Sequence, residues 1–456
     1  MESLQQYNKI FFIGVAGTGM SALAQYCNGI GKHVIGSDRY FGNSTTNEIQ
    51  QQLTQFGIQC FAQDASGIDA SIDVVVISTA VEDTNIEVQK AKALGITILK
   101  RSQLLTLISK TKKTIAVGGT SGKSTTTAML FDILEVAGLQ PSIISGAGLV
   151  RLQEKGLIGN AWVGNGDWLV IEADESDGSI VYYEPQIGVL LNIDKDHKEI
   201  EELYEIFNLF KSNSKQFVVN QSNEHAAKFS LNKHNDFGVE LSNVGYSATA
   251  IQPNGFEVNF SINETAFSIN TFGVHNVENA LAASAVASLC GVNLNTSAKA
   301  IKAYKGIYRR NQILGTKHTV LVIDDYAHNP AKCAAAIKGV QAVSKNVVAW
   351  FQPHGYGPTR FLRNDFVHEL ATVLRPSDTI IMSEIFYAGG TAVKDISAND
   401  LIQDLKTKGC NAIFIEDRKN LTKNIKHLLQ NNSVLLLMGA RDPSLAQFAQ
   451  NVFDEL

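Results

Sequence analysis

The chain has 456 residues, of which 45% are hydrophobic and 18% charged, and its formal net charge is −5. This length predicts about three domains, and the acidic balance excludes a generally basic, nucleic-acid-binding surface. The sequence has no apolar run of the roughly 18 residues that a membrane span needs, and its polar start does not resemble a signal peptide. The five scattered cysteines fit reduced thiols, so a cytoplasmic protein without a membrane span is expected.

Short apolar runs alternate with helix-length segments, which predicts an α/β fold of parallel sheets covered by helices. We expect a Rossmann-like N-terminal domain at 1–108, a central phosphate-loop ATPase domain at 109–312 and a Rossmann-like C-terminal domain at 313–456. The polar stretch 109–113 is a candidate linker, or else a helix end, and a β-hairpin is expected within 239–271. The predicted strands are 9–13, 33–35, 73–77, 114–117, 168–171, 187–191, 217–219, 320–323, 347–351, 379–382, 412–415 and 433–438.

A glycine-rich turn follows the first predicted strand. Gly14, Gly17 and Gly19 form a GxxGxG pattern rather than the GxGxxG dinucleotide fingerprint. Asp38 ends the second strand, where a Rossmann unit places its ribose-binding acid. Taken alone, the pair is a weak signal, because a nucleotide site, an ordinary NAD site and a purely structural turn would each explain it.

The strongest signal is a phosphate loop after the strand at 114–117. Residues 118–125 read GGTSGKST and precede a helix-forming stretch, one residue short of the usual GxxxxGK[ST] spacing. Glycines let backbone N–H groups turn toward phosphate oxygens, and the helix N-terminus adds partial positive charge. Lys123 is expected to bridge the terminal phosphates and Ser124 to ligate Mg²⁺. The alternative, a turn that only starts a helix, is disfavoured by the intact GKST sequence.

Acidic segments follow the next two strands, at 172–177 (EADESD) and 192–197 (NIDKDH). Since ligands bind at the carboxyl ends of parallel strands, these segments predict a metal site beside the phosphate loop. Mg²⁺ prefers oxygen, so Glu172 is the better candidate ligand and His197 the less usual one. Without the phosphate loop, a solvated acidic turn with a capping histidine would be the simpler interpretation.

Together these motifs resemble the Mur ligase family, which builds the peptide stem of bacterial cell walls, and the resemblance covers essentially the whole chain. It implies ATP and Mg²⁺ as cofactors, and UDP-N-acetylmuramate with an amino acid or short peptide as partners; it leaves the oligomeric state open. The implied UDP-sugar site consists of Gly14, Gly17, Thr18, Gly19, Met20, Ser21, Ser37, Asp38, Ser78 and Ala80. The implied ATP site consists of Gly119, Thr120, Ser121, Gly122, Lys123, Ser124, Thr125, His275, Asn276, Asn279, Arg309 and Arg310.

The same resemblance implies the chemistry. ATP would phosphorylate the muramoyl carboxylate, and an amine would then attack the acyl phosphate. The implied catalytic residues are Lys123, Glu172, His197, Arg310 and His328, the magnesium ligands Ser124, Glu172 and His197, and the amine-site residues His328 and His354. Because the attacking amine must lose a proton, His328 or His354 is the candidate base.

Departures from the family pattern lie where the amine should be chosen. L-alanine ligases carry an arginine after the Phe-Gln-Pro-His motif ending here at His354, whereas this chain has Gly355. Other departures are Asn311 after the arginine pair, Asn329 after His328, and the turns 388–390 (AGG) and 439–443 (GARDP). L-alanine is therefore the default amine rather than a deduced one.

Four alternative functions remain. A murein peptide ligase would join a recycled tripeptide to the same UDP-sugar. A folylpolyglutamate-type ligase is disfavoured by the Gly14 turn, and an NAD-dependent dehydrogenase by the otherwise idle GKST loop. A non-catalytic nucleotide-binding regulator is disfavoured by the intact Lys123, Glu172 and His197.

Overall fold

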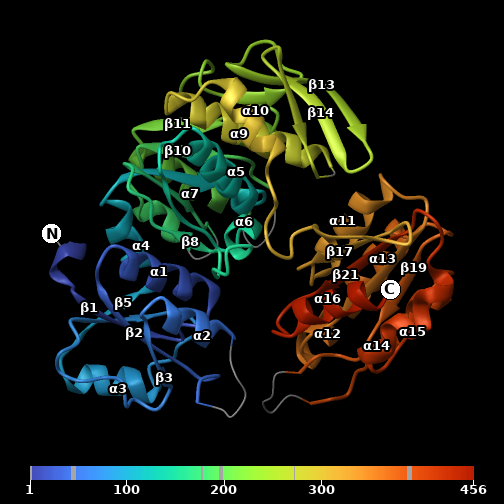
Figure 1. The fold of residues 1–456 in the computed structure, drawn as a ribbon, viewed down its shortest axis with the longest axis horizontal. Helices are drawn as coiled ribbons and strands as arrows, with labels where there is room; N and C mark the ends of the chain where they lie inside the picture. Colours follow the sequence, from blue (N-terminus) through green and yellow to red (C-terminus); the bar gives the residue numbers. More distant parts are fainter. Residues whose placement is uncertain (1–2, 43–47, 176–177, 195–198, 272, 388–392) are drawn as a thin grey trace. The chain divides into compact units, whose positions relative to one another are not determined.

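The computed structural model describes residues 3–42, 48–175, 178–194, 199–271, 273–387 and 393–456 (Figure 1). The chain forms two compact units. The first comprises residues 1–252, 259–270 and 274–305, and the second comprises 253–258, 271–273 and 306–456. Among the described residues, none of the helices combines the length and the apolar character that crossing a bilayer requires.

A five-stranded parallel sheet of order β3-β2-β1-β4-β5 begins the first unit. Its central strand is apolar and buried because helices cover both faces. The strand order reverses between β1 and β4, so the turn after β1 lies at the point where open α/β sheets bind ligands. The elements are η1 (Leu4–Gln6), β1 (Lys9–Ile13), α1 (Thr18–Gly29), β2 (His33–Asp38), α2 (Glu48–Gln55), β3 (Gln59–Ala62), β4 (Val74–Ile77), α3 (Ile86–Ala93), β5 (Thr97–Lys100) and α4 (Arg101–Ser109).

The second sheet of this unit has the order β11-β10-β6-β9-β7-β8 and is parallel except for β8. In its register Val117 pairs with Glu172 and Gly118 with Leu190, so the loops after β6, β9 and β10 leave the sheet at one edge. The strands are β6 (Lys113–Gly118), β7 (Ser142–Ile144), β8 (Ala161–Trp162), β9 (Trp168–Glu172), β10 (Ile187–Leu190) and β11 (Gln216–Val219). The helices are α5 (Lys123–Val136), α6 (Val150–Gln153), η2 (Ser179–Tyr182), α7 (Ile200–Asn213), α8 (Glu224–Ala227), α9 (Val274–Leu289) and α10 (Leu294–Lys302).

A small sheet of order β12-β13-β14-β15 follows in the chain. Its strands are β12 (Phe237–Val239), β13 (Tyr246–Asn254), β14 (Glu257–Ile262) and β15 (Thr265–Ile269). In β14 the residues Val258, Phe260 and Ile262 are buried and alternate with more exposed ones, as in a strand covered on one face. The predicted hairpin within 239–271 is therefore confirmed.

The second unit contains a six-stranded sheet of order β16-β17-β21-β18-β19-β20, in which only β16 runs antiparallel to its neighbour. The strands are β16 (Gln312–Lys317), β17 (Val320–Asp325), β18 (Val347–Gln352), β19 (Thr379–Met382), β20 (Ala412–Phe414) and β21 (Val434–Gly439). The helices are α11 (Pro330–Gln341), α12 (Tyr356–Phe361), α13 (Arg363–Val373), α14 (Ala398–Thr407), η3 (Arg418–Asn420), α15 (Leu421–Ile425), η4 (Lys426–Leu428) and α16 (Leu445–Glu455).

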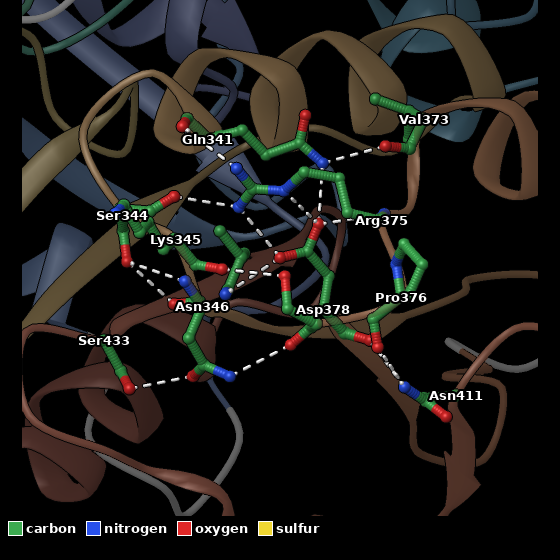
Figure 2. Close-up of polar contacts among 12 residues, drawn as sticks. Gln341, Ser344, Lys345, Asn346, Val373, Arg375, Pro376, Asp378, Asn411 and Ser433 are labelled. Atoms are coloured by element: carbon green, nitrogen blue, oxygen red, sulfur yellow. Dashed lines mark hydrogen bonds and ion pairs between the residues drawn. The ribbon is translucent and has the colours of Figure 1, made fainter.

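A polar network closes the amino-terminal edge of this last sheet (Figure 2). The fully buried Asp378 accepts hydrogen bonds from Arg375 Nε at 2.9 Å, Gln341 Nε2 at 2.8 Å and Val347 N at 3.1 Å. Burial opposes ionisation, but these donors outweigh it and hold the pKa of Asp378 below its ordinary value. Asn346 extends the network by donating to Ser377 O at 2.9 Å.

The predicted α/β fold class is confirmed, and each predicted strand coincides with an observed one. The candidate linker at 109–113 includes the last residue of α4, a short turn and the first residue of β6, so the alternative of a helix end also applies. Strands β3, β5, β7, β8 and β16 were not predicted. Strands β3, β5, β8 and β16 lie at sheet edges and include exposed or half-buried residues, and the buried strand β7 has only three residues, so none of them contains a long apolar run.

Candidate active site

The phosphate loop lies between β6 and α5, as predicted. Gly122 is the N-cap of α5 with φ +80°, and a Cβ there would lie 2.5 Å from Asn279 Oδ1. Gly119 has φ +136°, so both positions require the conformational freedom of glycine. The loop thus directs the N-terminus of a 14-residue helix toward the sheet edge, which is a favourable position for an anion.

Lys123, the first residue of α5, is held beside the loop by two acceptors. Its Nζ donates to Gly119 O at 2.7 Å and to Glu175 Oε2 at 2.7 Å, and Asp174 Oδ1 lies 4.0 Å away. Glu175 is only 6% exposed, so the ion pair is largely shielded from water. The sequence identified the acidic segment but not Glu175 as the partner of the lysine.

Ser124 and Glu172 meet across the sheet edge. Ser124 Oγ donates to Glu172 Oε2 at 3.0 Å, while Glu172 Oε1 accepts from Ser145 Oγ at 2.7 Å and from Gly146 N at 2.8 Å. In octahedral Mg²⁺ sites with ligands at about 2.0–2.1 Å, adjacent oxygens lie roughly 2.9 Å apart. The Ser124–Glu172 pair therefore fits two neighbouring positions of a magnesium shell.

The third predicted ligand, His197, lies outside the described residues. Among the residues that are described, no three His, Cys, Asp or Glu side chains gather as a metal-binding group. Ser145, which orients the carboxylate of Glu172, was missed because it lies 27 residues away on a neighbouring strand end.

The loop after β10 braces the phosphate loop from the side. Asn192 Oδ1 accepts from Thr120 Oγ1 at 2.9 Å and from Ser121 N at 2.8 Å. Asp194 N in turn donates to Thr120 Oγ1 at 3.0 Å. Thr120 and Ser121 are therefore fixed by side chains from the second acidic segment.

Helix α9 supports the loop from the other side. Asn279 is buried, and its Oδ1 accepts from Thr126 Oγ1 at 3.2 Å, while its Nδ2 donates to Asn276 Oδ1 at 3.4 Å. His275 is exposed near the start of the helix. Asn279 thus packs against Gly122, and His275 is the member of this motif with surface to offer a ligand.

The turn after β1 forms a separate cluster. Gly14 has φ +78°, and the Gly14 and Val15 amides donate to Ser37 O at 2.8 and 2.9 Å. Asp38, 6% exposed, accepts from Ala16 N at 3.1 Å. Asp38 therefore positions the glycine-rich turn.

The remaining predicted UDP-sugar residues differ in exposure. Gly17 and Thr18 at the start of α1 and Ala80 after β4 are exposed, and Gly19 and Ser78 are half-buried. Met20, Ser21 and Ser37 are buried and support the site from within.

Two residues near α1 were missed from the sequence. The side chain of Arg101 packs on Gly19, where an added Cβ would lie 3.1 Å from Arg101 Cδ. Asn160, fully buried, donates through Nδ2 to Thr18 O at 2.7 Å and to Ser21 Oγ at 2.9 Å. Arg101 therefore adds positive charge beside this helix N-terminus, and Asn160 ties it to the loop before β8.

In the second unit, the two predicted arginines have different surroundings. Arg309 is buried, and it donates through Nε to Asp324 Oδ2 at 2.8 Å and through Nη2 to Gly439 O at 2.9 Å. Arg310 is exposed. Arg309 joins the ends of β17 and β21, and Arg310 has its side chain in solvent.

His328 and His354 lie together, with ring centroids 5.8 Å apart. His328 Nδ1 is 2.9 Å from Tyr326 O, which can only accept, so Nδ1 carries the proton and Nε2 is left as an acceptor. His354 Nδ1 is buried and has no hydrogen-bond partner among the described residues.

Both rings favour the neutral form. Burial, the His328 ring and Arg441 lower the pKa of His354 to about 4. Burial lowers the pKa of His328, and the positive charges of Lys332, Arg441 and Arg310 lower it further. The hydrogen bond to Tyr326 O raises this pKa but does not offset the decrease. An unprotonated imidazole with a free Nε2 is the form that accepts a proton from an amine.

Family models match three successive parts of the chain: residues 9–113 (Mur ligase family, catalytic domain), 117–287 (Mur ligase middle domain) and 309–441 (Mur ligase, glutamate ligase domain). The UDP-N-acetylmuramate–L-alanine ligase of Dictyoglomus turgidum is 34% identical over 95% of this chain and 94% of its own length. The ligase of that name from Aquifex aeolicus is 32% identical over 96% and 95%.

Solved structures of Mur ligases have the same fold as this chain. The UDP-N-acetylmuramate–alanine ligase of Thermotoga maritima matches with a TM-score of 0.80 and 26% identity over 98% of both chains. A murein peptide ligase from Psychrobacter arcticus shares the fold, with a TM-score of 0.66 and 20% identity over 98% of both chains. At this identity and coverage, the chain belongs to the Mur ligase family of ATP-dependent ligases.

Proposed function

We propose that this chain joins L-alanine to the carboxylate of UDP-N-acetylmuramate, using ATP and Mg²⁺, as a cytoplasmic step of peptidoglycan synthesis. The choice of these two substrates is supported by the 34% identity, over 95% of the chain, to a relative named for this reaction. The phosphate loop and the Ser124–Glu172 pair support the phosphoryl-transfer half of the proposal.

The first step is phosphorylation of the muramoyl carboxylate. Lys123 and the loop amides bind the terminal phosphates, and their positive charge stabilises the transferring phosphoryl group. Ser124 and Glu172, with His197 as the resemblance implies, would hold Mg²⁺, which would further neutralise this charge. Of the arginine pair, Arg310 is assigned to ATP and Arg309 to supporting β17, because Arg309 is already paired with Asp324.

The second step is attack of the amine on the acyl phosphate, which releases phosphate and forms the amide. The attacking nitrogen must be neutral, so its proton passes to a base. We assign His328 Nε2 to this role because its ring is neutral and its Nδ1 proton is fixed by Tyr326. His354 packs beside it as a second neutral ring.

The domains divide these tasks in the proposal. Residues 1–108 bind the UDP-sugar through the turn after β1 and the N-terminus of α1, with Arg101 added to the predicted set. Residues 109–312 bind ATP, and residues 313–456 bind the amine.

Phosphate release with ATP, Mg²⁺ and UDP-N-acetylmuramate tests the proposal when L-alanine, other amino acids and the murein tripeptide are compared as amines. Turnover with L-alanine is expected. Turnover with the tripeptide alone would make the chain a recycling ligase. ATP binding without phosphate release for any amine would remove the ligase assignment for these substrates and favour a regulator.

A further inference from the structure

Three adjacent strand ends in the second unit carry His328, Arg441 and His354. Strand β21 lies between β17 and β18, and its Met438 pairs with both Asp325 and Phe351. Arg441 follows Met438 by three residues, just as His328 follows Asp325 and His354 follows Phe351. The register therefore places Arg441 between the two histidines at the carboxyl edge of the sheet.

The backbone at Arg441 is unusual. Its φ is +67°, in the left-handed region that side chains other than glycine, Asn and Asp rarely adopt. The loop is held on both sides of this residue. Arg309 Nη2 donates to Gly439 O at 2.9 Å, and Arg418 Nη1 donates to Asp442 Oδ2 at 2.5 Å. Backbone strain that the surroundings hold in place is characteristic of ligand-binding positions.

The three arginines of this edge differ in their partners. Arg309 and Arg418 are committed to Asp324 and Asp442 respectively. The Arg441 side chain is exposed and forms no hydrogen bond or ion pair with any residue that the structure describes. Its planar guanidinium is therefore available to an external anion, beside two histidines that are neutral.

We propose that Arg441 binds the α-carboxylate of the incoming amino acid and so selects acceptors that carry one. This inference rests on the proposed function and names the group that recognises its amine. A guanidinium binds a carboxylate through two parallel N–H···O bonds, which fix orientation as well as position. The carboxylate and amine of an α-amino acid share one carbon, so fixing the first holds the second near His328 Nε2.

The same assignment accounts for a departure in the sequence. Gly355 offers no side chain after His354. Positive charge comes instead from the neighbouring strand end, where Arg441 lies in the turn 439–443. Arg310 and Lys332 also carry positive charge near His328. Arg441 differs from them in two ways: it follows the strand that lies between those carrying the two histidines, and its backbone is held in a left-handed conformation.

The test compares Arg441→Gly, which accepts the left-handed backbone, with Arg441→Lys, which keeps the charge. The control is Asn432→Gly, since Asn432 also has a left-handed φ (+63°) but lies before β21, at the opposite end of the strand. For Arg441→Gly we expect KM for L-alanine to rise roughly 10- to 100-fold, the usual effect of losing a hydrogen-bonded charge. The KM of Arg441→Lys for L-alanine should lie between those of Arg441→Gly and the wild type.

Four further readouts separate recognition from structural damage. KM for ATP and UDP-N-acetylmuramate, and ADP–ATP exchange without amine, should stay within about twofold of the wild type in Arg441→Gly, because the phosphorylation step does not involve the amine. Turnover of L-alaninamide, which lacks the carboxylate, should be weak and should be equal in the wild type and in Arg441→Gly.

An unchanged KM for L-alanine in Arg441→Gly, or an equal loss with L-alaninamide, overturns the assignment. So does loss of ADP–ATP exchange, which would indicate structural damage. Turnover with the murein tripeptide but not L-alanine also overturns it, because the reacting residue of that peptide has no free α-carboxylate. Failure of the proposed function is recognised separately, as absence of phosphate release by the wild-type protein with every amine.

Discussion

The two edges of the sheet in the second unit handle polar groups in opposite ways. At the amino-terminal edge, Asp378 is fully buried and accepts from both a guanidinium and an amide side chain (Figure 2). At the carboxyl-terminal edge, His354 Nδ1 is buried without a partner among the described residues, and Arg441 combines a left-handed backbone with an exposed guanidinium. An edge whose polar groups all have hydrogen-bond partners stabilises the fold. An edge with unpartnered polar groups is one at which a ligand can supply the missing partners.

The central sheet of the first unit repeats this contrast. Before β6, Lys112 Nζ donates to Gly164 O and Gly166 O, both at 2.7 Å, and burial lowers the pKa of its ammonium. After β6, the phosphate loop presents a helix N-terminus and a lysine at the opposite edge. Substitutions at the two edges should consequently separate stability from activity.

Lys123→Ala should have the largest effect. Removing the cation that stabilises the transferring phosphoryl group should lower kcat by about 10³-fold or more, roughly 4 kcal/mol. The unfolding midpoint should stay close to that of the wild type. Lys113→Ala is the matched control, since Lys113 begins the same strand and is exposed in an ion pair with Asp167 at 3.2 Å. Equal loss of activity in both variants would contradict the contrast between the edges.

Asp378→Ala should act on stability instead. Removing the buried carboxylate takes away the charged acceptor that Arg375, Gln341 and the Val347 amide share, so the free energy of unfolding of the second unit should fall by about 3 kcal/mol. Denaturant titration of the full chain measures this change. Activity below the unfolding transition should remain within about twofold.

The control for Asp378 is Asp404→Ala. Asp404 pairs with Arg363 at 2.7 Å, but both side chains are more than a third exposed, so its loss should cost less than about 1 kcal/mol. A similar cost for the two variants would show that the Asp378 network contributes no more than a surface ion pair.

Glu175→Gln should have a smaller effect, on ATP affinity. The Glu175 carboxylate competes with phosphate oxygens for Lys123 and repels them, so its neutralisation should lower the Kd for ATP about 3- to 10-fold, roughly 1 kcal/mol. Calorimetric titration measures the Kd, with Glu184→Gln as the control for an exposed glutamate in an ion pair with Lys110. Weaker ATP binding would instead mean that Glu175 positions Lys123 for the nucleotide.

The smallest expected change is in the titration of His328. Burial and nearby cations hold its pKa below the ordinary value, so the ring stays neutral at a lower pH than a free histidine. Arg441→Gly removes one cation and should raise this pKa toward the ordinary value. NMR titration of the ring measures the shift, using His328→Gln to assign the signal. The Asn432→Gly control should titrate like the wild type, and a pKa that does not rise in Arg441→Gly would place the arginine away from the ring.

The predictable features were local in the sequence. Strands such as β1 and β21 are continuous apolar runs buried on both faces, and the phosphate loop is a contiguous motif. Edge strand β16 mixes exposed and half-buried residues and carries no such pattern. Apolar runs therefore predicted most of the central parallel strands, and missed the edge strands and the three-residue interior strand β7.

The supporting contacts of the site could not be predicted, because they join distant segments. Lys123 and Glu175 are 52 residues apart, and Asn160 and Thr18 are 142 apart. These pairs depend on strand register and loop path, which no short window of sequence specifies. The partner of Arg309 was missed for the same reason, since a consecutive arginine pair does not indicate that one member turns inward.

The position of β21 in its sheet has a consequence for synthesis on the ribosome. This strand separates β17 from β18, yet it begins at Val434, whereas β17 ends at Asp325 and β18 at Gln352. At translation speeds of about 5–20 residues per second, the earlier strands wait several seconds for their shared neighbour. During that interval their apolar edges are open to intermolecular pairing, so protection by a chaperone would act on the nascent second unit before β21 is made.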